Sequence, residues 1–406
     1  MTTQVPPRSA YPWFLASSSL WMAGMSLQGF LFTWLLVGTL EIPADEVGFA
    51  RSLAEFPPLL ILLLGGILGD RSNARSYLMT MHLLMCIPPL LVAMVFGLGL
   101  LNYWWVVGFA VLMASIQSLS DPARQATLSR VARMDVQRAV TAMTACTSLV
   151  GLAGVYVGGQ METLGLTTVL VIQSLLFLAG LGAARQLPSL PVAVAVQRPG
   201  LASGLKAVLR IPLIRDVIGL NLLSSLFNAG AYVIAIPFIV KDVYLGNAET
   251  LATAMIVFTA GAIGSSIILL YFMPLKHPGR IYLGMQLTRL VILVLIWLQP
   301  ASWLFHLALF GWGLHMGIGT TLVRTTVQEL APVQERAQIL SLLLLSFMVS
   351  APVSAILLGQ VIEHWDPLSA LVPGMAISVV LFVLGTWCTG LWHYQAPGTG
   401  TVRAAG

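Results

Sequence analysis

The sequence predicts an all-α polytopic membrane protein with twelve transmembrane helices in two pseudo-symmetric six-helix bundles. Three observations support this fold class. First, the 406 residues are 58% hydrophobic and only 9% charged, whereas soluble proteins carry about 25% charged residues. Second, twelve stretches are apolar over the roughly 20 residues that a helix needs to cross the hydrocarbon core. Third, one polar segment near the middle of the chain leaves six stretches on each side.

The twelve stretches follow one another at short intervals. The first begins at Tyr11 and is too long for the core of a cleaved signal peptide, so we expect it to be retained as a span. The expected spans are 12–38, 46–69, 76–100, 102–121, 139–161, 166–186, 214–240, 248–273, 280–298, 301–323, 337–361 and 368–394.

The basic residues indicate the orientation of these spans. If the N-terminus is cytoplasmic, most Lys and Arg residues lie in cytoplasmic segments, including Arg124 after the fourth span. Only Lys241 lies outside, and Arg51 and Arg289 lie within spans. Because cytoplasmic loops are enriched in Lys and Arg, we expect a multi-pass protein of a bacterial-type plasma or inner membrane. Both termini are then cytoplasmic.

The polar segment between the sixth and seventh spans divides the chain. It contains PSLPVAVAVQRPGLASGLK, which is rich in residues that interrupt regular structure. We expect an N-terminal six-helix bundle at 1–186, a cytoplasmic linker at 187–213 and a C-terminal bundle at 214–406; an incidental loop is the alternative. The segments ARQATLSRVARMDVQRA and VRTTVQELAPVQERAQ follow the fourth and tenth spans and resemble each other, as a duplication of six spans predicts.

A family resemblance rests on the loop after the second span. Its sequence GGILGDRSNAR resembles motif A of the major facilitator superfamily, although Asn73 replaces the usual glycine. SDPARQATLSRV and TTVQELAPVQERAQ are similar to loops of the branch that holds siderophore exporters and related secretion proteins. The resemblance covers nearly the whole chain and implies the major facilitator fold. The residues that match motif A are Gly66, Leu68, Asp70, Arg71 and Arg75.

Motif A of that family implies a latch on the cytoplasmic face. By this resemblance Asp70 faces the N-terminus of the eleventh span near Arg336, while Arg71 or Arg75 pairs with Asp121. Each contact lies at the water boundary, where a charge–dipole or ion-pair contact contributes about 1 kcal/mol. The alternative is that the arginines serve only as topology signals in an ordinary turn.

The fifth span contains a glycine-rich segment, TSLVGLAGVYVGGQM. It resembles a motif of exporters in the same superfamily, which implies export. Gly154, Gly158 and Gly159 match the motif, and Val155 replaces its proline. Small residues also permit close helix packing in general, so packing without a role in transport direction is the alternative.

Ionisable residues within spans are candidates for proton coupling, because a charge in hydrocarbon costs about 2.5 kcal/mol or more. Glu55 lies near the middle of the second span, and Arg51 lies one turn earlier on the same face. Glu55 is either a proton carrier opposed by Arg51 or half of a static ion pair. Arg289 lies in the ninth span, a peripheral helix of the fold, so we expect a structural pair rather than substrate contact.

The fold that the resemblance implies lines its central cavity with the first, fourth, seventh and tenth spans. Their mid-depth residues are amides and aromatics with few charges, which suits an amphipathic organic substrate. His315 could titrate near neutral pH, or hydrogen-bond a neighbouring helix. The cavity candidates are Trp21, Gln28, Ser115, Gln117, Asn228, Tyr232, Trp312 and His315.

We therefore expect a secondary transporter that exports a small amphipathic, drug- or siderophore-like molecule by alternating access. An importer or lipid flippase is the alternative, because the fourth span lacks the arginine usual in drug–proton antiporters of the family. We expect a coupling proton to drive transport, since the chain has no GxxxxGK[ST] motif for bound nucleotide. Without HExxH, GxSxG or a Cys/His cluster, we expect no enzyme, metal or cofactor. We also expect a monomer in the lipid bilayer that binds no nucleic acid.

Overall fold

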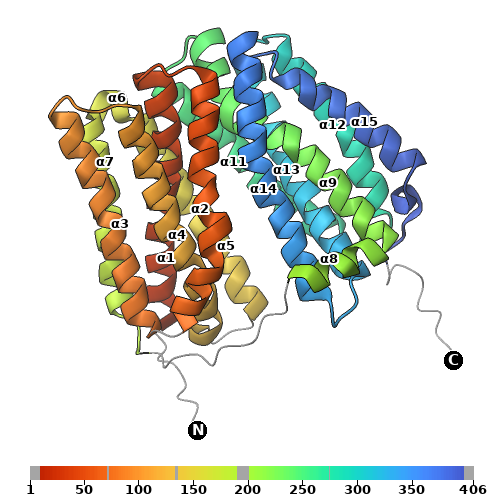
Figure 1. Ribbon diagram of the computed structural model, residues 1–406, viewed down its shortest axis with the longest axis horizontal. Coiled ribbons are helices and arrows are strands. Elements are labelled where there is room, and N and C mark those ends of the chain that lie inside the picture. Colours follow the sequence, from red (N-terminus) through yellow and green to blue (C-terminus); the bar gives the residue numbers. More distant parts are fainter. Residues whose placement is uncertain (1–9, 71–72, 133–135, 190–200, 274, 397–406) are drawn as a thin grey trace, which may run out of the picture. The chain divides into compact units, whose positions relative to one another are not determined.

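The computed structural model describes residues 10–70, 73–132, 136–189, 201–273 and 275–396, and helices dominate this part of the chain (Figure 1). The α-helices are α1 (Ala10–Trp34), α2 (Ala44–Asp70), α3 (Ala74–Gly97), α4 (Tyr103–Val131), α5 (Val136–Gly159), α6 (Met161–Leu164), α7 (Leu166–Arg185), α8 (Leu201–Arg210), α9 (Pro212–Gly230), α10 (Ile236–Phe238), α11 (Ala248–Phe272), α12 (Pro278–Trp297), α13 (Ser302–Leu330), α14 (Arg336–His364) and α15 (Leu371–Trp387). Wider π-helical turns extend α1 as η1 (Leu35–Thr39) and α9 as η2 (Ala231–Ala235) and η3 (Ile239–Val243), and a 3-10 turn, η4 (Gly390–His393), follows α15.

Local sequence signals explain several helix starts. The Asn73 side chain accepts a hydrogen bond from the backbone N–H of Arg75, and Asn102 accepts from the N–H groups of Trp104 and Trp105. An asparagine side chain at this position satisfies N–H groups that have no partner within the helix. Both α9 and α12 begin with proline, whose fixed φ suits the first helical position.

The chain forms two compact units. Unit 1 comprises residues 1–43, 50–197 and 246–256, and unit 2 comprises 44–49, 198–245 and 257–406. The helices α2 and α11 each run through both units.

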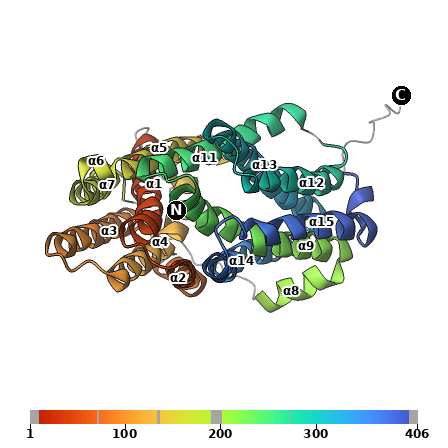
Figure 2. The same cartoon turned by 90° about the horizontal axis from the view of Figure 1, so that it is seen from above.

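In unit 1, α1 is the central helix (Figure 2). It packs against α4, α5 and α7, and α3 packs against α4 and α7. Gly154 lies at the crossing of α1 and α5, where a Cβ atom would overlap the backbone oxygen of Ala23. Because lipid is as apolar as the side chains, such close contacts rather than water exclusion hold the helices together.

In unit 2, α9 packs against α13, α14 and α15, and α12 packs against α13 and α15. Gly313 of α13 plays the role that Gly154 has in unit 1, because a Cβ atom there would overlap the backbone oxygen of Phe258 on α11. The facing helices of unit 2 enclose the cavity described below.

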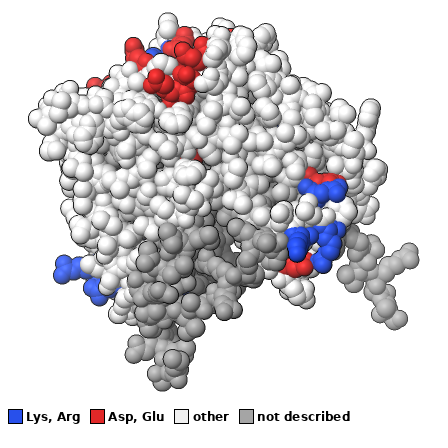
Figure 3. Space-filling view, viewed as in Figure 1, with Lys and Arg blue, Asp and Glu red and all other residues white. Residues whose placement is uncertain are grey.

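The described helices confirm the predicted all-α membrane fold. Among the described residues, nine helices are long and apolar enough to cross a membrane. The remaining expected spans correspond to α2, α13 and the shorter apolar helix α15. Most of the visible face in Figure 3 carries neither acidic nor basic groups, and acidic atoms gather at its upper end.

The sequence placed two helix ends too early. The fourth span was expected to end at residue 121, but α4 continues to Val131, and α13 continues to Leu330 instead of 323. Arg124, which the sequence placed in the segment after the fourth span, is therefore a buried residue of α4. A hydropathy pattern marks the apolar part of a helix and does not report how far the helix extends beyond it.

The segment 187–213 includes a helix, α8, within what the sequence indicated as a linker. It packs against α14, and Arg210 at its end forms an ion pair of 2.6 Å with Glu335 before α14. The limits 1–186, 187–213 and 214–406 for two bundles and a linker stay a prediction.

Candidate functional site

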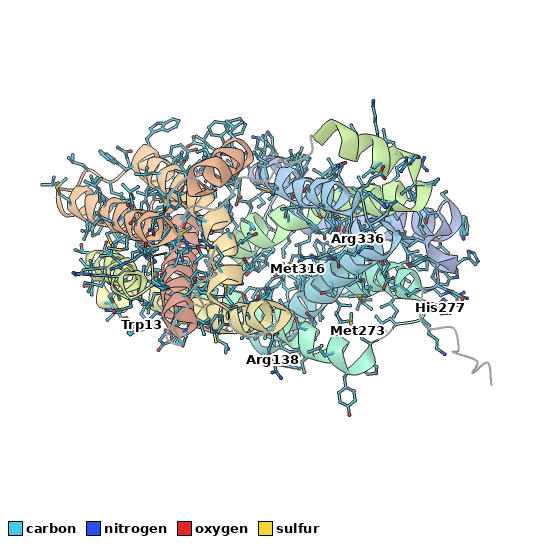
Figure 4. All side chains as sticks on the ribbon, turned by 90° about the horizontal axis from the view of Figure 1, so that it is seen from below. Trp13, Arg138, Met273, His277, Met316 and Arg336 are labelled. Carbon is cyan, nitrogen blue, oxygen red and sulfur yellow. The ribbon has the colours of Figure 1, made fainter. Side chains whose placement is uncertain are left out.

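A cavity of about 270 Å³ lies within unit 2. Four residues that the sequence predicted for the substrate cavity line it: Asn228, Tyr232, Trp312 and His315. They come from α9, η2 and α13, which pack together. Met316 of α13, labelled in Figure 4, also lines the cavity and is 45% exposed.

Aromatic rings form one part of the cavity lining. The rings of Tyr232 and Phe258 stack with centroids 3.8 Å apart. The Trp312 ring stands edge-on to both, at 6.3 Å from Tyr232 and 6.0 Å from Phe258. Such a group offers a large apolar surface with little side-chain freedom to lose on binding.

Polar side chains of α9 and α12 form another part. Asn221, Ser224 and Asn228 recur on one face of α9, and Gln286 and Arg289 lie one turn apart on α12. The cavity therefore combines apolar rings with a few polar groups, which is the usual composition of a small-molecule site.

Arg289 is the charged residue of this lining, whereas the sequence favoured a structural pair over substrate contact. Among the described residues Arg289 forms no ion pair. Its Nε donates to Ser378 Oγ at 2.9 Å and its Nη1 donates to Ser224 Oγ at 2.6 Å. The pattern of Asn221, Ser224 and Asn228 on the neighbouring helix was the sequence signal that could have placed Arg289 at the cavity.

His315 hydrogen-bonds a neighbouring helix. Its Nε2 lies 2.9 Å from the Met285 backbone oxygen, and because a carbonyl can only accept, this nitrogen donates. The bond joins α13 to α12, so the structure forms the helix–helix contact that the sequence left open for His315. The same side chain still lines the cavity.

The four predicted cavity residues of unit 1 are held by local contacts. Gln28 accepts from Gln173 Nε2 at 3.0 Å, and Ser115 donates to the backbone oxygen of Val111 at 2.7 Å. Gln117 is half-buried and interacts with the Asp121 carboxylate of the next turn. Trp21 is 2% exposed and belongs to the buried cluster described next.

A buried polar cluster in unit 1 escaped the sequence analysis. The Arg124 guanidinium donates to Ser120 and Ser18, and its Nη2 lies 3.2 Å from His82 Nε2. Ser17 Oγ lies 2.9 Å from the same His82 atom. The early end given to the fourth span hid Arg124, whereas His82 and the serine run Ser17–Ser19 were visible as polar residues within apolar stretches.

Arg51 and Glu55 form the ion pair that the sequence offered as one of two possibilities. Their side chains meet at 2.8 Å and are 24% and 32% exposed. The Arg51 guanidinium also lies over the Phe32 ring of α1, 5.9 Å from its centroid.

Most of the predicted cytoplasmic latch cannot be placed. Gly66 and Asp70 belong to α2, but their side chains lie outside the described residues, as does Arg71. Within the described part of the chain, Arg75 forms no ion pair with Asp121, which instead interacts with Gln117 and with Arg124 one turn later. Arg336 begins α14, and its Nη2 donates to the Ala331 backbone oxygen at 3.4 Å.

The three glycines of the predicted export motif lie at close helix contacts. A Cβ atom at Gly158 would overlap the Phe30 ring of α1, and one at Gly159 would overlap the Ala252 side chain of α11. Together with Gly154 they permit the approach of α5 to its neighbours. Among the described residues, no group of three or more His, Cys, Asp or Glu side chains could hold a metal ion.

Several solved structures of known proteins share this architecture. No curated protein matches the chain in sequence. The nucleoside transporter NupG has a TM-score of 0.73 and 14% identity over 97% of this chain and 100% of its own. A POT family transporter in complex with a thioalcohol-conjugated peptide has a TM-score of 0.70 and 11% identity over 95% of this chain and 99% of its own. The xylose transporter XylE from E. coli has a TM-score of 0.70 and 13% identity over 96% of this chain and 97% of its own.

At these identities the solved structures are similar to this chain in fold alone. A sequence family provides the closer assignment, because the Major Facilitator Superfamily matches residues 14–355. The match includes most helices of both units and most of the residues that line the cavity. The chain is therefore a multi-pass membrane transporter of the Major Facilitator Superfamily.

Proposed function

We propose that this transporter exports a small amphipathic organic molecule by proton-coupled alternating access. The cavity of unit 2 is the observation that carries the proposal. It brings together Asn228, Tyr232, Trp312 and His315 at a volume of about 270 Å³, close to the lower limit of about 300 Å³ for small-molecule sites. Its stacked rings suit an apolar body, and its amides suit a polar end.

The export direction is proposed on the resemblance of the glycine-rich segment of α5 to a motif of exporters. Gly154 and Gly158 permit close contact with α1, which ordinary helix packing explains equally well. Uptake is the second candidate, because a D-xylose–proton symporter is among the solved structures that share this fold, with a TM-score of 0.71 and 12% identity over 92% of this chain and 96% of its own.

For the coupling proton we propose Glu55, with Arg51 as the residue that holds the ionised carboxylate. The proposal rests on the place of Glu55 within the second span, since the ion pair of 2.8 Å is common to a proton carrier and to a static pair. Protonation of Glu55 would release Arg51. The latch of Asp70, Arg71, Arg75, Asp121 and Arg336 is proposed on the resemblance of motif A.

We propose a monomer, with both termini cytoplasmic in a bacterial-type plasma or inner membrane.

The sign of proton movement tests the proposal. The purified chain is reconstituted in proteoliposomes with a trapped pH dye, and valinomycin with equal potassium on both sides holds the membrane voltage at zero. One test compound is then added outside, with empty liposomes as control. The compounds are uridine, D-xylose, a dipeptide, 2-naphthol and 2-naphthalenesulfonate. Exchange of an entering amphipathic compound for a lumenal proton makes the lumen alkaline. Acidification would mean symport and would support uptake instead.

A further inference from the structure

Only two of the three nitrogens of the Arg289 guanidinium form hydrogen bonds with the described residues. It is 2% exposed, and two of its nitrogens donate to Ser378 on α15 and Ser224 on α9. Its third nitrogen, Nη2, has no hydrogen-bond partner among the residues that the structure describes. An arginine with a purely structural role would be expected to use all of its donors when it is this deeply buried.

The charge of Arg289 has no counter-charge in the cavity. All of the described residues that line the cavity are neutral apart from Arg289 and the titratable His315. The two serines that hold Arg289 donate or accept hydrogen bonds but carry no charge. A buried cation without an anion is unfavourable, so the residues that line the cavity leave the charge of Arg289 uncompensated.

Three buried amide atoms in the same cavity also have no hydrogen-bond partner within the described part of the chain. They are Asn221 Nδ2, Asn228 Oδ1 and Gln286 Oε1. Ser224, which accepts from Arg289, lies one turn from both Asn221 and Asn228 on α9. The contact with Ser224 therefore places the free end of Arg289 beside the α9 face that carries both asparagines.

We propose that the cavity of unit 2 binds the anionic group of a singly charged aromatic acid, with Arg289 as the residue that binds it. This inference rests on the proposed function, because it names the substrate class of the same cavity. Nη2 of Arg289 and the amide of Asn221 donate to the carboxylate or sulfonate oxygens. The rings of Tyr232, Phe258 and Trp312 contact the apolar body of the ligand. One arginine compensates one charge, which excludes a strongly anionic ligand such as a nucleotide.

The experiment measures binding by equilibrium dialysis with the purified full-length chain in lipid nanodiscs. The probes are three aromatic acids, benzoate, 2-naphthoate and indole-3-acetate, each compared with its uncharged carboxamide, and empty nanodiscs correct for partition into lipid. At least one acid is expected to bind about tenfold more tightly than its amide, as a charge-assisted hydrogen bond to arginine predicts. No preference for any acid in the wild-type protein would overturn the proposal.

Two variants assign the preference to Arg289. Arg289→Gln is expected to abolish the preference for the acid while the amide still binds. Gln286→Glu keeps Arg289 and its bonds to both serines, but it supplies a carboxylate one turn away that occupies the guanidinium. It should weaken binding of the acid and not of the amide, so the test does not depend on whether Arg289→Gln folds. Persistence of the preference in both variants would overturn the assignment.

Arg324→Gln is the matched control, because Arg324 is an exposed arginine of α13 outside the cavity lining. Its preference for the acid should equal that of the wild type, and a loss there would show that the effect is not specific to Arg289. The dialysis reports binding without transport. An acid that binds through Arg289 but moves no protons in proteoliposomes would contradict the proposed function alone, whereas transport of 2-naphthol without any acid preference would contradict this inference alone.

Discussion

The guanidinium carbon of Arg124 lies 4.0 Å from the centroid of the Trp21 ring. Both side chains are buried, at 5% and 2% exposure. The negative face of an indole stabilises a desolvated cation by about 2 kcal/mol or more. This contact joins α4 to α1 in unit 1, and together with Ser18, Ser120 and the nearby Asp121 carboxylate it accommodates Arg124 among apolar helices.

We expect Trp21→Leu to lower the thermal unfolding midpoint of the purified protein in detergent by several degrees, because it removes the ring that faces Arg124. Trp21→Phe should keep part of the stabilisation. The control is Trp13→Leu on the same helix, where Trp13 is 42% exposed. Equal shifts for Trp13→Leu and Trp21→Leu would show that the Arg124 contact contributes nothing measurable.

Gly154→Ala is expected to destabilise the protein, because the added Cβ atom would overlap the backbone oxygen of Ala23 and separate α5 from α1. Gly108→Ala on α4 is the control, since no atom lies within 4 Å of its Cβ position. In a helix that substitution contributes up to about 1 kcal/mol of stability. The thermal unfolding midpoint and the yield of monodisperse protein are measured for both variants. Wild-type stability of Gly154→Ala would contradict the close packing of α5 against α1.

Two glutamates each satisfy the first N–H group of a helix. In unit 2, Glu363 accepts from the backbone N–H of Ala44 at 3.0 Å; in unit 1, Glu162 accepts from Ala248 at 3.1 Å. A carboxylate at a helix N-terminus is favoured by the hydrogen bond and the helix dipole, together about 1 kcal/mol. Both alanines are buried.

Removal of either carboxylate should expose its own helix start and leave the other unchanged. We expect Glu363→Ala to accelerate the labelling of Ala44→Cys by a membrane-impermeant maleimide severalfold. Glu162→Ala should act in the same way on Ala248→Cys. Each glutamate is the control for the other pair, and equal acceleration at both cysteines would mean that the effect is general loosening.

Glu55→Gln tests the proton carrier. Glutamine cannot release a proton, so substrate-driven pH change in the proteoliposome lumen should fall to the level of empty liposomes while exchange of substrate across the membrane continues. Glu249→Gln, an exposed carboxylate in the first turn of α11, should leave both unchanged. Undiminished proton movement in Glu55→Gln would leave the Arg51–Glu55 pair with a structural role only.

The sequence predicted the fold class because hydrophobic length and charge are direct consequences of the bilayer. The resemblance to the major facilitator fold also implied that the seventh and tenth spans line a cavity. The polar and aromatic residues chosen at mid-depth of these two spans, Asn228, Tyr232, Trp312 and His315, all line the cavity of unit 2.

The sequence could not predict what depends on distant contacts. Whether Arg289 pairs with a carboxylate or with Ser224 and Ser378 is decided by helices that are far apart in the chain. The cluster of Arg124 and His82 was missed for a related reason, because burial of α4 beyond its apolar stretch comes from the helices packed around it.

The most direct test of the account is chemical blockage of the unit 2 cavity. Asn228→Cys is introduced into a chain in which Cys86, Cys146 and Cys388 are replaced by serine, and N-ethylmaleimide is applied before transport is measured in proteoliposomes. Modification is predicted to stop transport, and the transported compound is predicted to slow the modification; Arg324→Cys should show neither effect. Full transport by completely modified Asn228→Cys would contradict a substrate path through this cavity.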